Sequence, residues 1–292
     1  MKISGFIERN VKWLFPLPAV IFILVMMVFP ILYTFFVSFT DWNMSSGGTI
    51  NFIGLGNYVA MFQEPRFYNA FWLTLYFTIL AVGVETVLGV IIALILDREF
   101  RGKNLAKLIL LLPMVATPVA VGLSWTLFYE PTIGLGNYAL KLLGLPTSKW
   151  LASNFAVIPS LALVDIWQWT PMISLIVMAG LAGLPTEPYE AALVDGATPL
   201  QTLRRVTLPL LRPTILIAVV LRSIDALKTY DIIYVMTAGG PGFASETLNI
   251  YAYNLGFGYF RFGAASSALV ALFAIVLGFS LIVLKIRKTY DF

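Results

Sequence analysis

Six long runs of apolar residues alternate with short polar segments along this chain of 292 residues. Each run is long enough for a helix of about 20 residues, the length that crosses the hydrocarbon layer of a membrane. The runs cover residues 13–39, 71–96, 105–129, 155–181, 214–235 and 263–284. The first run is too long for a signal-peptide core and lacks an A-x-A cleavage pattern, so we interpret it as a retained span. The pattern predicts an all-α, polytopic membrane protein with six transmembrane helices.

Composition supports this class. Hydrophobic residues make up 59% of the chain and charged residues 12%, about half the usual charged share, which excludes a soluble globular protein. The chain has no cysteine and no histidine, so disulfides, thiol chemistry, the commonest general base and the commonest metal ligand are all missing. We therefore predict no enzyme activity, no catalytic residue, no metal site and no cofactor of its own.

Lysine and arginine gather on one side of the six-span pattern. The side that carries most of them holds Lys2, Arg9, Lys12, Arg98, Arg101, Lys103, Lys107, Arg204, Arg205, Arg212, Lys285, Arg287 and Lys288. The opposite side holds Arg66, Lys141, Lys149 and Arg261. By the positive-inside rule both termini are cytoplasmic. We predict a cytoplasmic N-terminal segment over 1–12 and a single transmembrane domain over 13–292, with a cytoplasmic loop at 183–212. This sidedness, rather than nucleic-acid binding, accounts for the net charge of +4.

The most polar part of that loop, residues 190–209, reads EAALVDGATPLQTLRRVTLP and predicts two short helices around a glycine. Thr186 is expected to cap the first helix, with Glu187 in its first turn, where a negative charge suits the helix dipole. Gly196 is expected to end it. The pattern predicts a rigid surface on which a partner protein docks.

The second helix of the loop has its own start and stop signals. Thr198 precedes a proline at the first helical position, and Gln201 follows three residues after the cap, which is the pattern of a capping box. Arg204 and Arg205 would lie in its last turn. We expect the prolines at 209 and 213 to end this helix before the next span.

Two of the predicted spans carry polar residues that are costly inside a membrane and indicate a water-lined path or a paired structural site. In the fourth span, Asp165, Gln168, Trp169 and Met172 recur at helical spacing and share one face. A carboxylate, an amide and an indole on one face suit a sugar, because hydroxyl groups need hydrogen-bond partners and the apolar face of a sugar ring stacks on an aromatic ring.

The fifth span carries Arg222, Asp225, Lys228 and Asp231 at steps of three residues, so each basic group has an acidic neighbour within reach on the same helix. Arg222 and Asp225 share a face with Thr229. The cluster is either part of a substrate path or an ion-pair ladder with a structural role. Glu85 in the second span is a separate acid, and the sequence leaves its role open.

The hexapeptide Ile-Gly-Leu-Gly-Asn-Tyr occurs at 53–58 and again at 133–138. The flanking sequences differ, so we interpret both copies as a turn followed by a helix start. Neither copy completes a G-x-G-x-x-G pattern, and the chain contains no G-x-x-x-x-G-K-[ST] motif. The chain therefore cannot hydrolyse ATP by the P-loop route, and if ATP is used it is bound by other subunits, as the resemblance given next implies.

The polar loop resembles a known motif. Glu190-Ala191-Ala192, then Gly196, then 206–209 (VTLP) are similar to the EAA motif of binding-protein-dependent ABC importer permeases. The residues Asp195-Gly196-Ala197 and Gln201, and the Thr-x-Gly-Gly-Pro turn at 237–241, resemble the maltose-type permeases of the carbohydrate-uptake subgroup. The resemblance implies the type I ABC importer permease fold and coupling of the loop to an ATPase. The implied coupling residues are Glu190, Ala191, Ala192, Asp195, Gly196, Leu208 and Pro209.

In this family sugar contacts lie on the spans before and after the EAA loop. The resemblance therefore implies a substrate path lined by Asp165, Gln168, Trp169, Met172, Arg222, Asp225 and Thr229. It further implies a multi-pass protein of a prokaryotic cell membrane that imports a sugar such as maltose or trehalose. The implied partners are a second, non-identical permease, two ATP-binding cassette subunits and an extracytoplasmic sugar-binding protein.

Three alternatives stay open at this point. An ABC permease for another solute, such as glycerol phosphate or another sugar, would share the same loop. An ion-coupled secondary transporter would use Glu85, Asp165 or Asp225 as coupling acids and would work without an ATPase, although we find no repeat symmetry between its halves. A membrane-embedded enzyme is disfavoured by the missing Cys and His.

Overall fold

The computed structural model describes residues 11–13, 15–47 and 50–289, and this part of the chain is helical apart from its loops and one isolated β-bridge. The predicted all-α class is confirmed. Residues 1–10 of the predicted N-terminal segment lie outside the described residues. By internal contacts the chain divides into two compact units: the first contains Met1–Glu64 and Ala252–Ala271, and the second contains Pro65–Tyr251 and Leu272–Phe292. The single domain over 13–292 stays a prediction.

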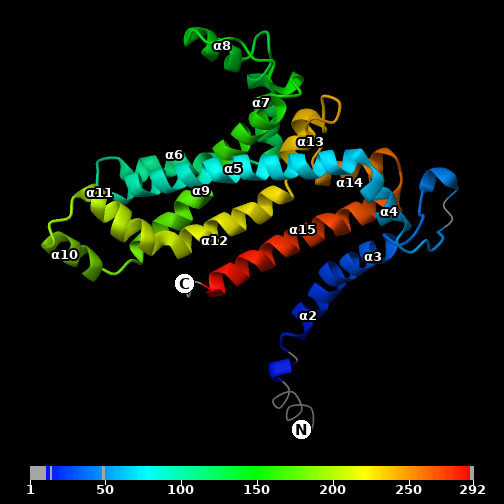
Figure 1. Ribbon diagram of the computed structural model, residues 1–292, viewed down its shortest axis with the longest axis horizontal. Helices are drawn as coiled ribbons and strands as arrows, with labels where there is room; N and C mark the ends of the chain where they lie inside the picture. Colours follow the sequence, from blue (N-terminus) through cyan, green and yellow to red (C-terminus); the bar gives the residue numbers. More distant parts are fainter. Residues whose placement is uncertain (1–10, 14, 48–49, 290–292) are drawn as a thin grey trace. The chain divides into compact units, whose positions relative to one another are not determined.

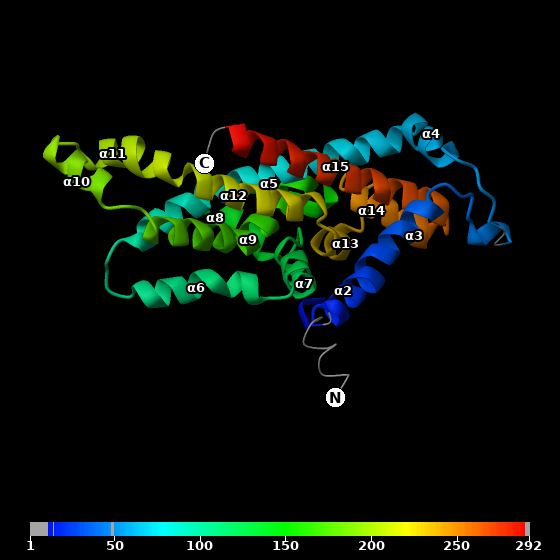
Figure 2. The ribbon, with the colours of Figure 1, turned by 90° about the horizontal axis from the view of Figure 1, so that it is seen from below.

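The second unit holds most of the helices, and Figures 1 and 2 show their order along the chain. They are α5 (Pro65–Asp97), α6 (Lys103–Val115), α7 (Pro118–Phe128), α8 (Leu135–Leu142), α9 (Val157–Ala182), α10 (Glu187–Val194), α11 (Pro199–Thr202), α12 (Leu208–Leu227) and α13 (Asp231–Thr237). Helices α14 (Leu248–Tyr253) and α15 (Phe262–Thr289) each have residues in both units.

The centre of the second unit is a three-helix core in which α5, α9 and α12 pack against one another (Figures 1 and 2). Small residues let these helices approach closely, as is usual between membrane helices. A Cβ atom on Gly89 of α5 would lie 2.7 Å from Ile173 of α9, and one on Gly180 of α9 would lie 2.6 Å from Thr214 of α12. These glycines therefore set the spacing of the core.

The predicted third span is bent rather than straight. Helices α6 and α7 meet at an angle of 95°. Pro118 is the first residue of α7, and the two residues before it, Ala116 and Thr117, are extended with ψ of 140°. The ring of a proline disfavours helical backbone in the preceding residue, which explains why the helix breaks here and restarts in a new direction. Pro113, by contrast, is accommodated inside α6.

The prediction that prolines 209 and 213 end the second loop helix is wrong. The chain is helical without interruption from Pro199 to Leu227: α11 leads through a π-helical turn at Leu203–Thr207 directly into α12. Pro209 directly follows the π-helical turn and Pro213 lies inside α12, and the helix continues past both prolines. The loop helix and the fifth predicted span are thus one continuous helix.

The fifth span is also shorter than its apolar run. Helix α12 ends at Leu227, and α13 begins after a break at Lys228–Tyr230. The side chain of Asn249 in α14 donates a 2.8 Å hydrogen bond to the Lys228 carbonyl oxygen at this break. A carbonyl that loses its helical partner at a helix end needs such a donor. Helix α13 then packs against α7, so the two half-helices that follow the breaks lie together.

Within the described residues, four helices are long and apolar enough to cross a membrane: Val11–Val37, Pro65–Asp97, Val157–Ala182 and Phe262–Val283. The bent pair α6 and α7 brings the number to five if it counts as one span. Helix α12 falls short by composition because its twenty residues include Arg212, Arg222 and Asp225. Six spans with both termini on the same side therefore stay a prediction.

The first unit contains the first apolar run, as α2 (Leu17–Ile23), a π-helical turn and α3 (Phe29–Val37), followed by α4 (Gly56–Gln63). Asn57 opens α4 and donates from its side-chain amide to the carbonyl oxygens of Ser38 (2.8 Å) and Thr40 (2.7 Å). The second copy of the hexapeptide behaves similarly within the second unit, where Asn137 bonds the carbonyl oxygens of Pro131 and Ser148. The prediction of a turn and helix start is confirmed for both copies.

The Thr-x-Gly-Gly-Pro turn ends α13 as expected. Ala238 and Gly239 have left-handed backbone with φ of 48° and 94°, which glycine adopts readily. The Thr237 and Ser245 hydroxyl groups lie 2.8 Å apart, and the Ser245 hydroxyl donates to the Gly240 carbonyl oxygen. The turn is therefore closed on itself by hydrogen bonds.

A partly buried ion pair fastens the segment after this turn to the start of α5. Arg66 donates to both carboxylate oxygens of Glu246, at 2.6 and 2.5 Å, and its guanidinium lies 4.1 Å from the ring centre of Phe243. Glu246 is fully buried. A bidentate arginine–carboxylate pair is among the strongest polar contacts in proteins, so this segment is held in one place.

Candidate functional site

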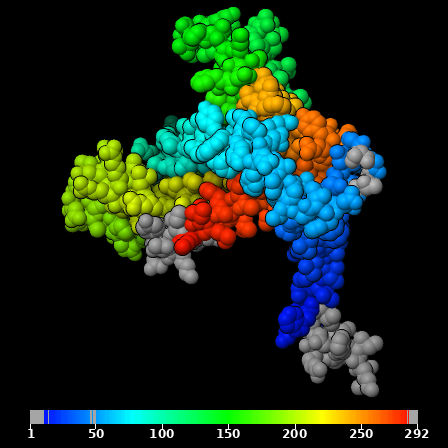
Figure 3. Space-filling model, turned by 45° about the vertical axis from the view of Figure 1, so that its right-hand side comes forward, coloured from blue at the N-terminus to red at the C-terminus, as the bar shows by residue number. Residues whose placement is uncertain are grey.

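The polar loop forms a protruding end of the second unit, coloured yellow-green in Figure 3. Helix α10 (Glu187–Val194) is followed by its C-cap Asp195 and then by Gly196, whose φ is +71°. The N–H of Ala197 donates to the Ala192 carbonyl oxygen (2.9 Å) and the N–H of Gly196 to that of Leu193 (3.1 Å). These two bonds define a Schellman motif, which requires left-handed backbone at the glycine position. The predicted stop at Gly196 is confirmed.

The predicted capping box of the second loop helix is also present. The N–H of Gln201 donates to the Thr198 hydroxyl oxygen, and the Gln201 side chain accepts from the N–H of Thr198 (2.8 Å). The predicted cap of the first helix is wrong, since the Thr186 side chain makes no capping bond; its carbonyl oxygen instead accepts from the N–H groups of Tyr189 and Glu190. Thr186 has helical backbone, whereas a capping side chain needs an extended one.

The loop presents apolar residues to its surroundings. Leu193 is 79% and Val194 88% exposed at the end of α10, while Ala192 beneath them is buried. The Tyr189 hydroxyl donates to that of Thr207 (3.2 Å), which fixes α10 to the helix that leads into α12. A cavity of about 530 Å³ lies at the base of the loop, between the end of α5, the end of α9, α10 and α11.

Of the residues predicted to couple to an ATPase, Glu190, Ala191, Asp195 and Gly196 are exposed, Leu208 and Pro209 are half-buried, and Ala192 is buried. The structure therefore brings the first group together on the surface of the protruding loop. The second group belongs to the start of α12.

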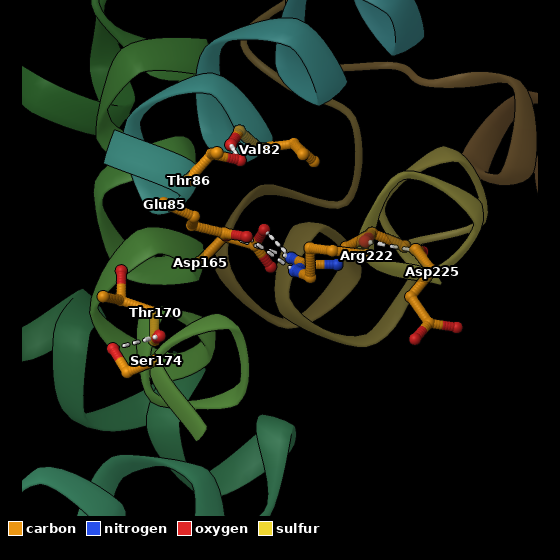
Figure 4. A network of polar contacts seen from close by, with 9 residues as sticks. Val82, Glu85, Thr86, Asp165, Thr170, Ser174, Arg222 and Asp225 are labelled. Carbon is orange, nitrogen blue, oxygen red and sulfur yellow. Dashed lines mark hydrogen bonds and ion pairs between the residues drawn. The ribbon is translucent and has the colours of Figure 1, made fainter. Parts of the chain in front are cut away.

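The polar residues of the three-helix core form one buried cluster (Figure 4). Arg222 of α12 meets Glu85 of α5, with Nε 2.8 Å from Oε2 and Nη2 3.3 Å from Oε1. The same guanidinium contacts the carboxylate of Asp165 in α9. Arg222 is 2%, Asp165 1% and Glu85 0% exposed. The cluster ties all three core helices together at a single point.

This cluster corrects the predicted pairing within the fifth span. Asp225 was expected to pair with Arg222. Its Oδ1 instead lies 3.3 Å from Nζ of Lys228, and the two side chains are 52% and 54% exposed. Figure 4 shows the Asp225 side chain pointing away from the Glu85–Asp165–Arg222 cluster. Arg222 instead takes its partners from other helices. The sequence left the role of Glu85 open, together with those of Lys228 and Asp231, and the signal for Glu85 was an acid inside an apolar run.

Gln168 also has a different surrounding from the one predicted. It is fully buried, and its Nε2 donates a 3.0 Å hydrogen bond to the carbonyl oxygen of Ala116. Ala116 is the residue at the end of α6, where the bend to α7 frees backbone groups from their helical partners. Gln168 of α9 thus supplies the hydrogen-bond donor that the Ala116 carbonyl oxygen lacks at the bend.

The remaining residues of the predicted path are partly accessible. Trp169 and Met172 of α9, and Thr229 just after α12, are half-buried. The ring centre of Trp169 lies 5.5 Å from the Arg222 guanidinium carbon, which places the indole beside the buried cluster. The predicted path residues therefore separate into an accessible set (Trp169, Met172, Asp225 and Thr229) and a buried set (Asp165, Gln168 and Arg222).

The described residues contain no group of three His, Cys, Asp or Glu side chains that could hold a metal ion. Together, the long apolar helices, the buried charges between them and a capped polar loop at one end are typical of a polytopic membrane transport protein. Comparison with known proteins identifies the family. The family described as "Binding-protein-dependent transport system inner membrane component" matches residues 53–286, and the chain belongs to it. It is a multi-pass membrane permease component of an ABC importer and is not an enzyme.

Relatives agree with this assignment, and a solved structure has a similar fold. A probable ABC transporter permease of Sinorhizobium fredii is 40% identical over 259 residues, which cover 88% of this chain and 83% of that one. The trehalose/maltose transport system permease MalF of Thermococcus litoralis is 34% identical over 284 residues, covering 96% and 95%. The fold resembles a chain in the crystal structure of a bacterial ABC transporter involved in alginate import, with a TM-score of 0.85, 23% identity and 99% coverage of both chains.

Proposed function

We propose that this permease conducts a sugar, and that its substrate is an α-glucoside such as maltose or trehalose. Two observations support the proposal. The chain is similar over nearly its whole length to a trehalose/maltose permease. Its accessible polar residues beside the core cluster combine an indole with a carboxylate and a hydroxyl, the groups that stack on and hydrogen-bond to a sugar.

The loop at 190–209 is proposed as the surface that docks on an ATPase subunit. The observation that carries this is the exposed apolar pair Leu193 and Val194 at the tip of α10, held in place by the Schellman motif at Gly196. Exposed apolar side chains on a rigid, polar loop are typical of a protein contact. A partner that binds this surface differently in two states would shift the permease between two conformations, as coupling requires.

The substrate path is proposed to follow the accessible set: Trp169, Met172, Asp225 and Thr229. In the described conformation the buried set, Asp165, Gln168 and Arg222, stands behind it and supports it, because these side chains expose almost no surface. Direct sugar contact by the buried set would need a different packing of α9 and α12.

The complete importer is proposed to contain a second, non-identical permease, two ATP-binding cassette subunits and an extracytoplasmic sugar-binding protein. ATP binds to the cassette subunits, since this chain has no P-loop motif. The distribution of lysine and arginine favours cytoplasmic termini and a cytoplasmic loop 183–212. In that orientation, the loop faces the ATPase subunits and the binding protein delivers sugar from the opposite side.

Reconstitution tests the function. Vesicles containing this chain, its second permease and the ATPase subunits should accumulate labelled maltose or trehalose only with internal ATP and external binding protein. The matched control omits the ATPase subunits and applies a proton or sodium gradient. Accumulation in that control would overturn the proposal in favour of an ion-coupled transporter. ATP-driven uptake of glycerol phosphate, but of neither disaccharide, would retain the importer and overturn the sugar assignment.

A further inference from the structure

The Glu85–Asp165–Arg222 cluster contains more negative than positive charge. Two carboxyl groups face one guanidinium, and all three side chains are almost completely buried. The next charged group on the three packed helices is Asp225 of α12, which points away from the cluster and pairs with Lys228 (Figure 4). If both buried acids were ionised, the cluster would hold one unbalanced negative charge.

An unbalanced charge at this depth is costly. Removing an ion from water into the interior of a protein costs several kcal/mol after relaxation, and an opposite charge offsets this only when each ion has its own partner. Arg222 can neutralise one carboxylate. The second acid must therefore be neutralised by something else, or the three helices would not pack around it.

Two contacts show where the missing positive charge belongs. The carboxyl groups of Glu85 and Asp165 lie side by side, because both accept a hydrogen bond from the same nitrogen, Nη2 of Arg222, and two ionised carboxylates offer only acceptors to one another. In addition, the buried Oδ1 of Asp165 has no hydrogen-bond partner among the described residues. The two neighbouring carboxyl groups and the unpaired Oδ1 of Asp165 therefore lack one hydrogen-bond donor, which a proton on either acid would supply.

We infer that the cluster binds one proton, shared between the carboxyl groups of Glu85 and Asp165. The proton turns one acid into a hydrogen-bond donor to the other, and the pair then carries a single negative charge against Arg222. Two acids that share one proton because they are too close to ionise together are a known arrangement in proteins. The cluster as a whole is neutral and can hold α5, α9 and α12 together inside a membrane.

A bound metal cation is the competing occupant. A sodium ion would need several oxygen ligands. The carboxylate oxygens Oε2 of Glu85 and Oδ2 of Asp165 already contact the guanidinium of Arg222 (Figure 4). A second cation at that position would lie against the arginine charge. A proton needs no such space, because it sits between the two carboxyl oxygens.

The inference predicts an unusual asymmetry between the members of the cluster. Glu85→Gln removes one acid and keeps a neutral hydrogen-bond donor in the same shape, so the total charge of the cluster stays at zero. Arg222→Gln leaves an acid pair without its counter-charge. We expect the Glu85→Gln complex to keep uptake within about threefold of the parent, and Arg222→Gln to lose folded complex.

Infrared spectroscopy of the purified complex at neutral pH tests the proton directly. The parent should show the carbonyl stretch of a buried carboxylic acid that exchanges slowly in deuterium oxide. Both Glu85→Gln and Asp165→Asn should lack this band, since either change leaves one acid to pair with Arg222. The control Glu130→Gln, at an acid that caps a surface turn, should retain it.

The absence of the band in the parent, or its persistence in both variants, would overturn the inference. So would a sodium-dependent rise in the unfolding temperature, measured against choline at equal ionic strength, that disappears in Glu85→Gln, because it would identify a metal cation as the occupant. If one variant does not assemble, the other variant and the parent spectrum still decide the question. None of these readouts depends on which solute is transported.

Discussion

The side-chain amide of Gln168 in α9 donates a 3.0 Å hydrogen bond to the carbonyl oxygen of Ala116, at the bend between α6 and α7. A residue of the fourth apolar run thus completes the backbone hydrogen bonding of the third. The bend itself follows from Pro118, but the bend is tolerable inside a membrane only because the freed carbonyl finds a donor.

Replacing Gln168 by leucine should therefore destabilise the protein. The change keeps the side-chain volume and leaves the Ala116 carbonyl oxygen without a partner, which we expect to lower the free energy of unfolding by about 1–3 kcal/mol. The measurement is chemical unfolding of the purified protein in detergent. Met172→Leu on the same helix is the control and should cost less than about 1.5 kcal/mol. Unchanged stability together with lost uptake would instead point to direct substrate contact by Gln168.

Placing valine at Gly196 should disrupt coupling without disturbing the membrane helices. A Cβ atom there would meet nothing within 4 Å, so the effect arises from the left-handed backbone alone; such backbone costs an ordinary residue about 1–2 kcal/mol, and a β-branched residue more. We expect α10 to change its direction, and ATPase stimulation by the loaded binding protein to fall.

The matched control for this experiment is Gly83→Ala in α5, another glycine with open space around it but ordinary helical backbone. It should be neutral or stabilising by up to about 1 kcal/mol. Normal uptake and normal ATPase stimulation in the Gly196→Val complex would contradict the proposed docking role of the loop.

Changes to the accessible set should affect transport more than stability. The ion pair of Asp225 and Lys228 is half exposed, and pairs of this kind contribute at most about 1 kcal/mol. Asp225→Asn and Trp169→Ala should therefore assemble with the ATPase subunits but take up sugar with a several-fold higher half-saturation concentration. Glu99→Gln removes another exposed pair, with Lys103, and should leave uptake unchanged. Failure of Asp225→Asn to assemble would favour a structural role for that pair.

The partly buried pair of Arg66 and Glu246 should behave in the opposite way. Arg66→Gln leaves the carboxylate of Glu246 buried without its guanidinium partner, which we expect to cost about 3–5 kcal/mol of stability. The double variant Arg66→Gln/Glu246→Gln should cost less than the sum of the two single changes, because neither side chain is then charged. A thermal unfolding series on the four proteins measures this coupling, and simple additivity would contradict a direct interaction.

Local signals in the sequence predicted local structure well. The capping box of Thr198 and Gln201 and the stop at Gly196 depend on residues only a few positions apart, so the geometry is decided within one turn of helix. The apolar runs located the helices for the same reason, since a run of about 20 apolar residues can satisfy its backbone only as a helix in a membrane.

Proline was a less reliable guide, because the same residue type had different effects at two places. At Pro118 the two preceding residues are extended and the helix breaks. At Pro213 the helix continues, because the packing of α12 against α5 and α9 holds the backbone helical despite one missing hydrogen bond. Tertiary packing decides between these outcomes, and a single sequence does not contain it.

The partners of the buried charges could not be predicted for a related reason. Helical spacing suggested Asp225 as the partner of Arg222, whereas the structure pairs Arg222 with Glu85, a residue 137 positions away, and with Asp165. Side chains on one helix at that spacing compete with acids on neighbouring helices, and the buried acids have no water to stabilise them. The sequence indicated which residues are costly inside the membrane, but not how they meet.

The uninterrupted helix from Pro199 to Leu227 has a mechanical consequence. At 1.5 Å per residue it is a rod of about 40 Å, with the capped loop at one end and Arg222 and Asp225 near the other. Because the backbone hydrogen bonding is continuous apart from the π-helical turn at Leu203–Thr207 and the proline at 213, a tilt imposed at the loop is carried along the helix to its far end. A movement of the loop caused by the proposed ATPase subunit would therefore reach the proposed substrate path through one continuous helix, without passing through contacts between separate helices.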